Sequence, residues 1–131
     1  MTPGPDVARI DRALGAVFDR CDVDPKRVAV SGFSDGASYA LTLGLANGDF
    51  FGKVVAFSPC VVSKGIELHG RPSFFLTHGT ADEILPINNC GRVLSKALQR
   101  SGYEVRYEEF EGRHEIPPGL AKTAFLWMAA P

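Results

Sequence analysis

A serine flanked by two glycines is the first feature of the sequence that could carry chemistry. It lies in the run Gly32-Phe33-Ser34-Asp35-Gly36, which has the G-x-S-x-G spacing typical of a nucleophile elbow, a sharp turn from a strand into a helix that exposes a serine hydroxyl. Both glycines are expected there because such a turn leaves no room for a Cβ on either side of the serine. The alternative is an incidental serine at a glycine-bordered strand end, so the pattern depends on its structural context.

A serine hydroxyl is a weak nucleophile at neutral pH unless a base takes its proton and an acid orients that base. Asp82 and His114 meet this need, because each lies in a loop directly after an expected strand. We therefore predict that Ser34 is the nucleophile, His114 the base and Asp82 the orienting acid. The backbone N–H of Asp35, at the start of the expected helix, is predicted to hold a developing oxyanion.

Three residues compete for the roles of acid and base. Glu83 is an alternative acid, but it is adjacent to Asp82 in sequence and is expected to point elsewhere. His78 closes an apolar strand and is better explained as a hydrogen-bonded structural histidine. His69 lies in a polar turn and is interpreted as a solvated loop residue. The histidines have no partner at helical spacing, so no metal site and no cofactor are predicted.

The elements that must position these residues follow from apolar periodicity. Stripes with helical spacing predict amphipathic or buried helices over residues 7–21, 36–45, 90–98 and 120–128. The helix near residue 90 is expected to have Asn88 or Asn89 as its N-cap. Short apolar or alternating runs predict strands over residues 27–30, 54–57, 73–77 and 103–107.

Apolar strands that alternate with helices are typical of the α/β class. We predict a mostly parallel sheet of about four strands with helices on both faces. The strand 27–30 is interpreted as buried, whereas the alternating strand 103–107 is expected near a sheet edge. Loops at the carboxyl ends of parallel strands meet at one edge of the sheet, so the three candidate residues are expected to lie together.

Composition restricts the class of protein. The 131 residues, 45% of them hydrophobic, predict one domain spanning 1–131. A net charge of -1 without a basic block argues against nucleic-acid binding. No uncharged stretch approaches the roughly 20 residues of a membrane span, and early charges interrupt any signal-peptide core. Cys21, Cys60 and Cys90 are odd in number and widely spaced, which predicts no disulfide framework and a reducing, cytoplasmic location.

With these residues in place, the sequence resembles the α/β-hydrolase superfamily, and within it the phospholipase/carboxylesterase group of small serine esterases. The order Ser, Asp, His is the one expected of that superfamily. The resemblance covers nearly the whole chain and rests on Asp24-Pro25-Lys26-Arg27-Val28, Gly32 to Gly36, His78-Gly79 with Asp82 and Pro86, and Gly112-Arg113-His114-Glu115-Ile116-Pro117. It implies hydrolysis of acyl esters through an acyl-enzyme, without a cofactor, by Ser34, Asp82 and His114.

The sequence departs from the group at its start. Members carry several strands before this point, together with the loop that supplies the second oxyanion-hole amide, so the chain resembles a truncated α/β-hydrolase. Loss of one oxyanion donor typically costs about 100- to 1,000-fold in kcat. The strand from Arg27 to Val30 would then have an unpaired edge, and we predict a homo-oligomer that covers it. One alternative is therefore a weak or inactive half-domain that acts as an assembly module.

The loops suggest which esters would fit. The connection between Ser58 and Pro72 is too short for a helical lid, so an open site is expected. Cys60, Val61, Ile84 and Leu85 are predicted to line it, which favours short or medium acyl esters as small-molecule substrates. A peptidase or thioesterase on the same three residues is a further alternative, because the machinery fixes acyl transfer and not the leaving group.

Overall fold

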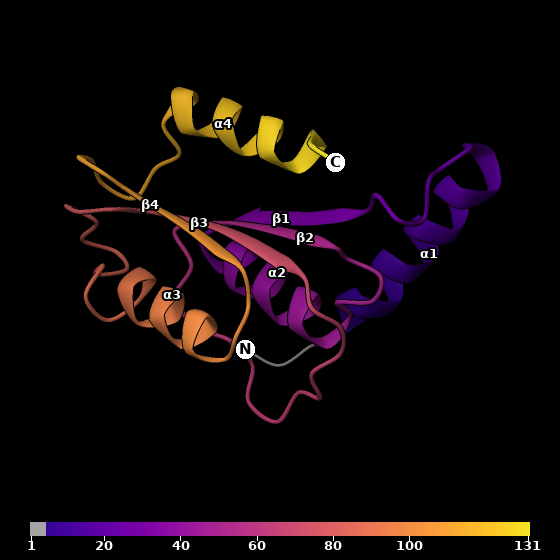
Figure 1. The fold of residues 1–131 in the computed structure, drawn as a ribbon, viewed down its shortest axis with the longest axis horizontal. Coiled ribbons are helices and arrows are strands. Elements are labelled where there is room, and N and C mark those ends of the chain that lie inside the picture. Colours follow the sequence, from indigo (N-terminus) through magenta and orange to yellow (C-terminus); the bar gives the residue numbers. More distant parts are fainter. Residues whose placement is uncertain (1–4) are drawn as a thin grey trace.

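The computed structural model describes residues 5–131, in which four helices and four strands alternate much as the periodicity predicts (Figure 1). The helices are α1 (Pro5–Arg20), α2 (Asp35–Ala46), α3 (Gly91–Arg100) and α4 (Pro118–Ala129). The strands are β1 (Ala29–Phe33), β2 (Lys53–Phe57), β3 (Ser73–Gly79) and β4 (Val105–Phe110). No helix within these residues combines the length and the apolar character that crossing a bilayer requires.

All four strands are parallel and follow the order β1-β2-β3-β4 across the sheet. The register aligns Phe33 with Phe57, and Phe57 with Thr77, at the carboxyl ends of three neighbouring strands. This arrangement confirms the predicted parallel α/β sheet. It also places β4 at an edge, as its alternating charged residues predict.

The core has two halves, one on each face of the sheet. On β2, Val54 and Ala56 pack with α2 and α3, whereas Val55 packs on the other face, where Ala124 of α4 lies. Figure 1 shows α2 and α3 below the sheet and α4 above it. The neighbouring residues Phe74 and Phe75 of β3 are fully buried in opposite halves, and burial of each side chain contributes roughly 1.5–3 kcal/mol. Helices on both faces are thereby confirmed.

The prediction that residues 27–30 form a buried strand is wrong. The strand β1 begins at Ala29, ends at Phe33 and alternates between exposed and half-buried residues. It is an edge strand of the sheet, because within residues 5–131 only β2 pairs with it. An apolar sequence indicates a potential for burial, but the other elements must supply the cover.

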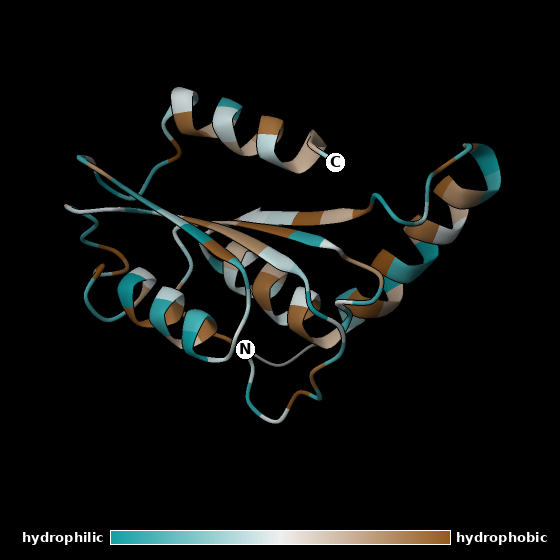
Figure 2. Cartoon of the chain, viewed as in Figure 1, coloured by the Kyte–Doolittle hydropathy of each residue, from teal (hydrophilic) through white to brown (hydrophobic). Residues whose placement is uncertain are grey.

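The helix α1 confirms the predicted amphipathic stripe, yet none of its residues is buried. It extends away from the sheet at one end of the molecule, and its surface alternates between apolar and polar residues (Figure 2). Ile10, Leu14 and Phe18 line one side of a groove of about 420 Å³ whose other side includes Phe50 and Phe51. The apolar face of α1 is therefore only partly covered.

A disulfide bond joins Cys60 to Cys90, so the interpretation that the cysteines form no disulfide framework is wrong for this pair. Cys60 lies in the loop after β2, whereas Cys90 is the N-cap of α3 and replaces the expected Asn88 or Asn89. Cys21 is a free, exposed cysteine. The fold brings the two half-cystines together across 30 residues of sequence, a closeness that their spacing alone does not reveal.

Candidate active site

Ser34 occupies the turn between β1 and α2 in a strained backbone conformation, with φ 58° and ψ -120°. Positive φ is uncommon for a residue with a side chain and is often found at functional sites. The turn is fixed by its own hydrogen bonds, since the Ser34 N–H donates to the carbonyl of Phe57 at 2.9 Å and the N–H of Ala37 donates to the Ser34 carbonyl. The structure thus has the strand, turn and helix expected of a nucleophile elbow.

The two glycines of the turn differ in the space that surrounds them. A Cβ on Gly32 would overlap the backbone of Gly36, so no larger residue fits at position 32. A Cβ on Gly36 would meet no atom within 4 Å. The prediction that the turn leaves no room for a Cβ is therefore correct at Gly32 and wrong at Gly36. Only Gly32 lies against the backbone of the helix that follows the turn.

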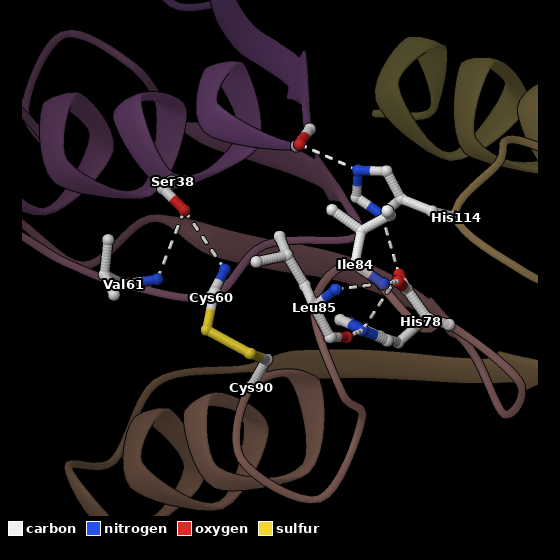
Figure 3. Close-up of a disulfide and its surroundings, with 10 residues drawn as sticks. Ser38, Cys60, Val61, His78, Ile84, Leu85, Cys90 and His114 are labelled. Carbon is white, nitrogen blue, oxygen red and sulfur yellow. Dashed lines mark hydrogen bonds and ion pairs between the residues drawn. A yellow bond between two sulfur atoms is a disulfide. The ribbon is translucent and has the colours of Figure 1, made fainter.

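His114 links Ser34 to Asp82 through its two ring nitrogens. Its Nε2 lies 2.8 Å from Ser34 Oγ, and its Nδ1 lies 2.7 Å from Asp82 Oδ2. A carboxylate only accepts hydrogen bonds, so Nδ1 carries the proton and Nε2 is left free to accept the Ser34 hydroxyl. The structure brings the three predicted residues into one hydrogen-bonded chain (Figure 3).

The electrostatic state of Asp82 is set by its surroundings. Its side chain is fully buried, which by itself would raise the pKa of the carboxyl. The backbone amides of Leu85 and Ile84 oppose this effect by donating to Oδ1 at 2.8 and 2.9 Å, as does His114 at Oδ2. The result is a pKa of Asp82 below its ordinary value. Asp82 is therefore a carboxylate at neutral pH, able to stabilise a charged imidazole.

Hydrogen bonds between two neighbouring loops position Asp82 and His114. The N–H of Thr80 donates to the carbonyl of Phe110, the last residue of β4, and the N–H of Ala81 donates to that of Gly112 in the loop that follows. A Cβ on Gly79 would overlap this loop at Gly112 and Arg113. The close approach of the two loops fixes the separation between the acid and the histidine.

Phe33 is a site residue that the sequence analysis missed. Its ring lies against the His114 imidazole, with 4.8 Å between the ring centroids, and the residue is 38% exposed. Its position directly before Ser34 could have predicted this contact, because the residues next to the nucleophile lie close to the base. The Phe33 ring is therefore part of the immediate surroundings of the base.

The alternative acid and histidines lie where they were expected. Glu83 is exposed, and the contact with His114 is made by Asp82. His78 is fully buried and hydrogen-bonded to the Leu85 carbonyl at 2.6 Å, as expected of a structural histidine. His69 is exposed, 3.7 Å from Glu67.

The residues predicted to line the site lie in two loops beside it. Val61 and Ile84 are 49% and 69% exposed, and Leu85 is half-buried. The N–H groups of Cys60 and Val61 donate to Ser38 Oγ at 3.1 and 3.2 Å (Figure 3). These residues therefore also have structural roles that were not predicted, since Ile84 and Leu85 hold Asp82 while Cys60 is in the disulfide. Their contact with substrate stays a prediction.

The predicted oxyanion donor, Asp35, is the first residue of α2. An N–H in the first turn of a helix has no partner within that helix, so this amide is free of the helical hydrogen-bond pattern. It directly follows Ser34, which puts it close to the atom that would attack. Its role as a donor stays a prediction.

Comparisons with known proteins bear on the family and the fold. A family model described as phospholipase/carboxylesterase matches residues 7–124. A comparison with curated proteins finds no match to the chain.

Among solved structures, esterase PE8 superposes with a TM-score of 0.78 at 26% identity. The match covers 92% of this chain and 59% of the PE8 chain. The Bacillus cereus carboxylesterase has a TM-score of 0.72 at 22% identity, with 90% and 54% covered. A thermostable esterase has a TM-score of 0.79 at 20% identity, with 96% and 36% covered. These last two share the fold. The chain spans less than two thirds of each of the three structures.

Proposed function

The chain belongs to the phospholipase/carboxylesterase family of α/β-hydrolases, and on that basis we propose that it is a serine esterase that acts through Ser34, His114 and Asp82. The observation that carries the proposal is the pair of short contacts on either side of the His114 ring, 2.8 Å to Ser34 Oγ and 2.7 Å to Asp82 Oδ2. Nucleophile, base and orienting acid need this mutual geometry.

In the proposed acylation step, Ser34 Oγ attacks the carbonyl carbon of the ester while its proton moves to His114 Nε2. The buried Asp82 carboxylate stabilises the imidazolium that forms. The carbonyl oxygen becomes an oxyanion, toward which the Asp35 N–H is the proposed donor. Collapse of this intermediate breaks the bond to the alcohol oxygen, and His114 returns the proton to the leaving alcohol.

Deacylation repeats the same proton transfers with water in place of the alcohol. His114 Nε2 takes a proton from a water molecule, and the resulting hydroxide attacks the acyl-Ser34 carbonyl carbon. The second oxyanion collapses, Ser34 Oγ recovers its proton and the carboxylic acid leaves. Each turnover consumes one water and requires no cofactor.

The proposed substrates are esters with short or medium acyl chains. The exposed apolar residues near Ser34 and Asp82 include Phe33, Val61 and Ile84, which suit a modest acyl group. The connection between β2 and β3 contains no helix, so this stretch supplies no helical lid.

Hydrolysis of p-nitrophenyl acetate and butyrate, together with labelling by a fluorophosphonate, tests the proposal. We expect both signals in the wild type, both absent in Ser34→Ala, and both retained in Ser101→Ala, a control at an exposed serine after α3. Equal hydrolysis by the wild type and Ser34→Ala would refute the proposal. A matched panel of ester, thioester and amide substrates separates the esterase from a thioesterase or a peptidase.

We also propose that β1 pairs with a second copy of the chain. Its outer edge has no neighbouring strand among the described residues, and Ala29, Ser31 and Phe33 are exposed along it. An unpaired edge presents backbone donors and acceptors to another strand, and two-fold pairing would join two sheets into one. Light scattering is expected to give a dimer, and a monomer at all concentrations would contradict this proposal. An inert dimer would instead favour the assembly-module alternative.

A further inference from the structure

His78 is a buried histidine that the proposed reaction does not use. It is the penultimate residue of β3 and its side chain has no exposed surface. Its Nε2 lies 2.6 Å from the Leu85 carbonyl oxygen and 3.4 Å from Asp82 Oδ2. Figure 3 shows the His78 imidazole beside Leu85.

The surroundings of the ring determine which nitrogen carries the proton. A carbonyl oxygen only accepts, so the short contact with Leu85 requires a proton on Nε2. Nδ1 has no hydrogen-bond partner among residues 5–131. It faces Gly91 in the first turn of α3, where an added Cβ would lie 2.7 Å from it. The ring therefore donates its hydrogen bond from Nε2, and that bond is directed at the Leu85 carbonyl.

Leu85 connects His78 to Asp82 through both of its backbone polar groups. Its N–H donates to Asp82 Oδ1 at 2.8 Å, and its carbonyl accepts the His78 hydrogen bond. Because both the N–H and the carbonyl of Leu85 are hydrogen-bonded, the backbone of the turn that begins at Asp82 has a fixed conformation. With Oδ1 occupied by backbone amides, Oδ2 is oriented toward His114.

The other charged groups near His78 are paired with each other. Glu109 of β4 stands opposite His78 in the strand register. Its carboxylate is held by the Arg92 guanidinium of α3 at 2.7 and 2.8 Å. Among residues 5–131, Asp82 is the carboxylate that lies within 3.4 Å of His78 Nε2, and the Leu85 N–H holds its other oxygen.

We propose that His78 is a positioning residue, whose Nε2–H fixes the Leu85 turn and thereby the orientation of Asp82 toward His114. Its importance for catalysis rests on the function proposed above, whereas its effect on the geometry of the His114–Asp82 hydrogen bond does not. The proposal can therefore be tested by a structural signal as well as by activity.

The structural signal is the low-field proton resonance of His114 Nδ1–H, identified by its absence in His114→Gln. We expect His78→Leu to lose this resonance or shift it upfield, while His69→Leu, at an exposed histidine, retains it. His78→Gln places an amide nitrogen close to the position of Nε2 and is expected to restore it. His78→Asn has a shorter side chain, whose amide nitrogen lies nearer the position of Nδ1 and does not reach the Leu85 carbonyl. This variant is not expected to restore the resonance. If His78→Leu fails to fold, the resonance in His78→Gln is compared with that in His78→Asn. Its presence in the first and absence in the second would support the inference, and equal signals in both would contradict it.

Steady-state kinetics give the second readout. We expect His78→Leu to reduce kcat about 10- to 100-fold, as a small misplacement of catalytic groups does, with little change in KM and recovery in His78→Gln. An unchanged resonance in His78→Leu would overturn the inference, as would its loss in His78→Gln, which would indicate ring packing instead of hydrogen bonding. If the wild type lacks Ser34-dependent hydrolysis, the proposed function fails, while the resonance still decides the role of His78.

Discussion

Cys60 and Cys90 are covalently joined, although one lies in the loop after β2 and the other is the N-cap of α3. Both belong to the loops beside Ser34 and Asp82. Ser38 of α2 holds the same region through hydrogen bonds to the amides of Cys60 and Val61. The disulfide and these hydrogen bonds together connect the helix after the nucleophile to the segment after the acid.

Removal of this disulfide is expected to destabilise the protein. The double variant Cys60→Ala/Cys90→Ala should lose about 2–4 kcal/mol of unfolding free energy, because the unfolded chain regains the freedom of the closed loop. Chemical denaturation measures the change, with Cys21→Ala as the control. A thiol assay on the unreduced, unfolded protein should find only Cys21 reactive. Reactivity of all three cysteines would contradict the pairing.

The choice between neighbouring carboxylates can be tested by exchanging each for its amide. Asp82→Asn is expected to reduce kcat by about 10,000-fold, because an amide no longer selects the histidine tautomer that leaves Nε2 free. Glu83→Gln removes the same charge one residue away and should leave kcat close to that of the wild type. Comparable losses in both variants would mean that net charge, and not the contact with His114, is what matters.

The two glycines around Ser34 offer a matched pair of substitutions. Gly32→Ala is expected to cost about 1–3 kcal/mol of stability, because its Cβ would overlap the Gly36 backbone. Gly36→Ala meets open space and should preserve both stability and fluorophosphonate labelling. Thermal unfolding and the labelling rate measure the two effects. A fully stable and reactive Gly32→Ala would show that the turn can widen.

The Arg92–Glu109 pair predicts a specific dependence of stability on pH. Two hydrogen bonds from Arg92, with a third from the Tyr107 hydroxyl, lower the pKa of Glu109 from 4.5 to about 2. Because the folded-state pKa is depressed, this stabilisation is fully present above about pH 4.5 and is lost as the pH falls toward 2. The melting-temperature difference between the wild type and Glu109→Gln should shrink over that interval. Exposed Glu111, changed to Gln, is the matched control, and a difference independent of pH would argue against the pairing.

Much of the candidate site could be predicted because its chemistry is local in sequence. The residues around Ser34 contain the strand end, the turn and the helix start, while Asp82 and His114 each follow a recognisable strand. The role of Leu85 could not be predicted, because it acts through its backbone N–H and carbonyl, which every residue except proline has. The same is true of the amide of Ile84.

Features that depend on distant parts of the chain could not be predicted from local patterns. The apolar run of β1 indicates burial, and its edge, unpaired among residues 5–131, was expected only from the strands that the resemblance says are missing. The cysteine spacing does not reveal a close approach. Disulfides are rare in reducing compartments, so fractionation with thiol trapping tests the predicted cytoplasmic location.

Ser34 and His114 follow β1 and β4, the two outer strands of the sheet, and their hydrogen bond spans 80 positions of sequence. Neighbouring strands in the sheet are also consecutive in the chain. Pairing of two such strands therefore closes a shorter stretch of chain than the contact between Ser34 and His114 does. Formation of the nucleophile–base contact therefore depends on the assembly of the complete sheet. During refolding, recovery of Ser34 reactivity is expected to lag behind recovery of secondary structure, so that catalytic competence marks the last stage of folding.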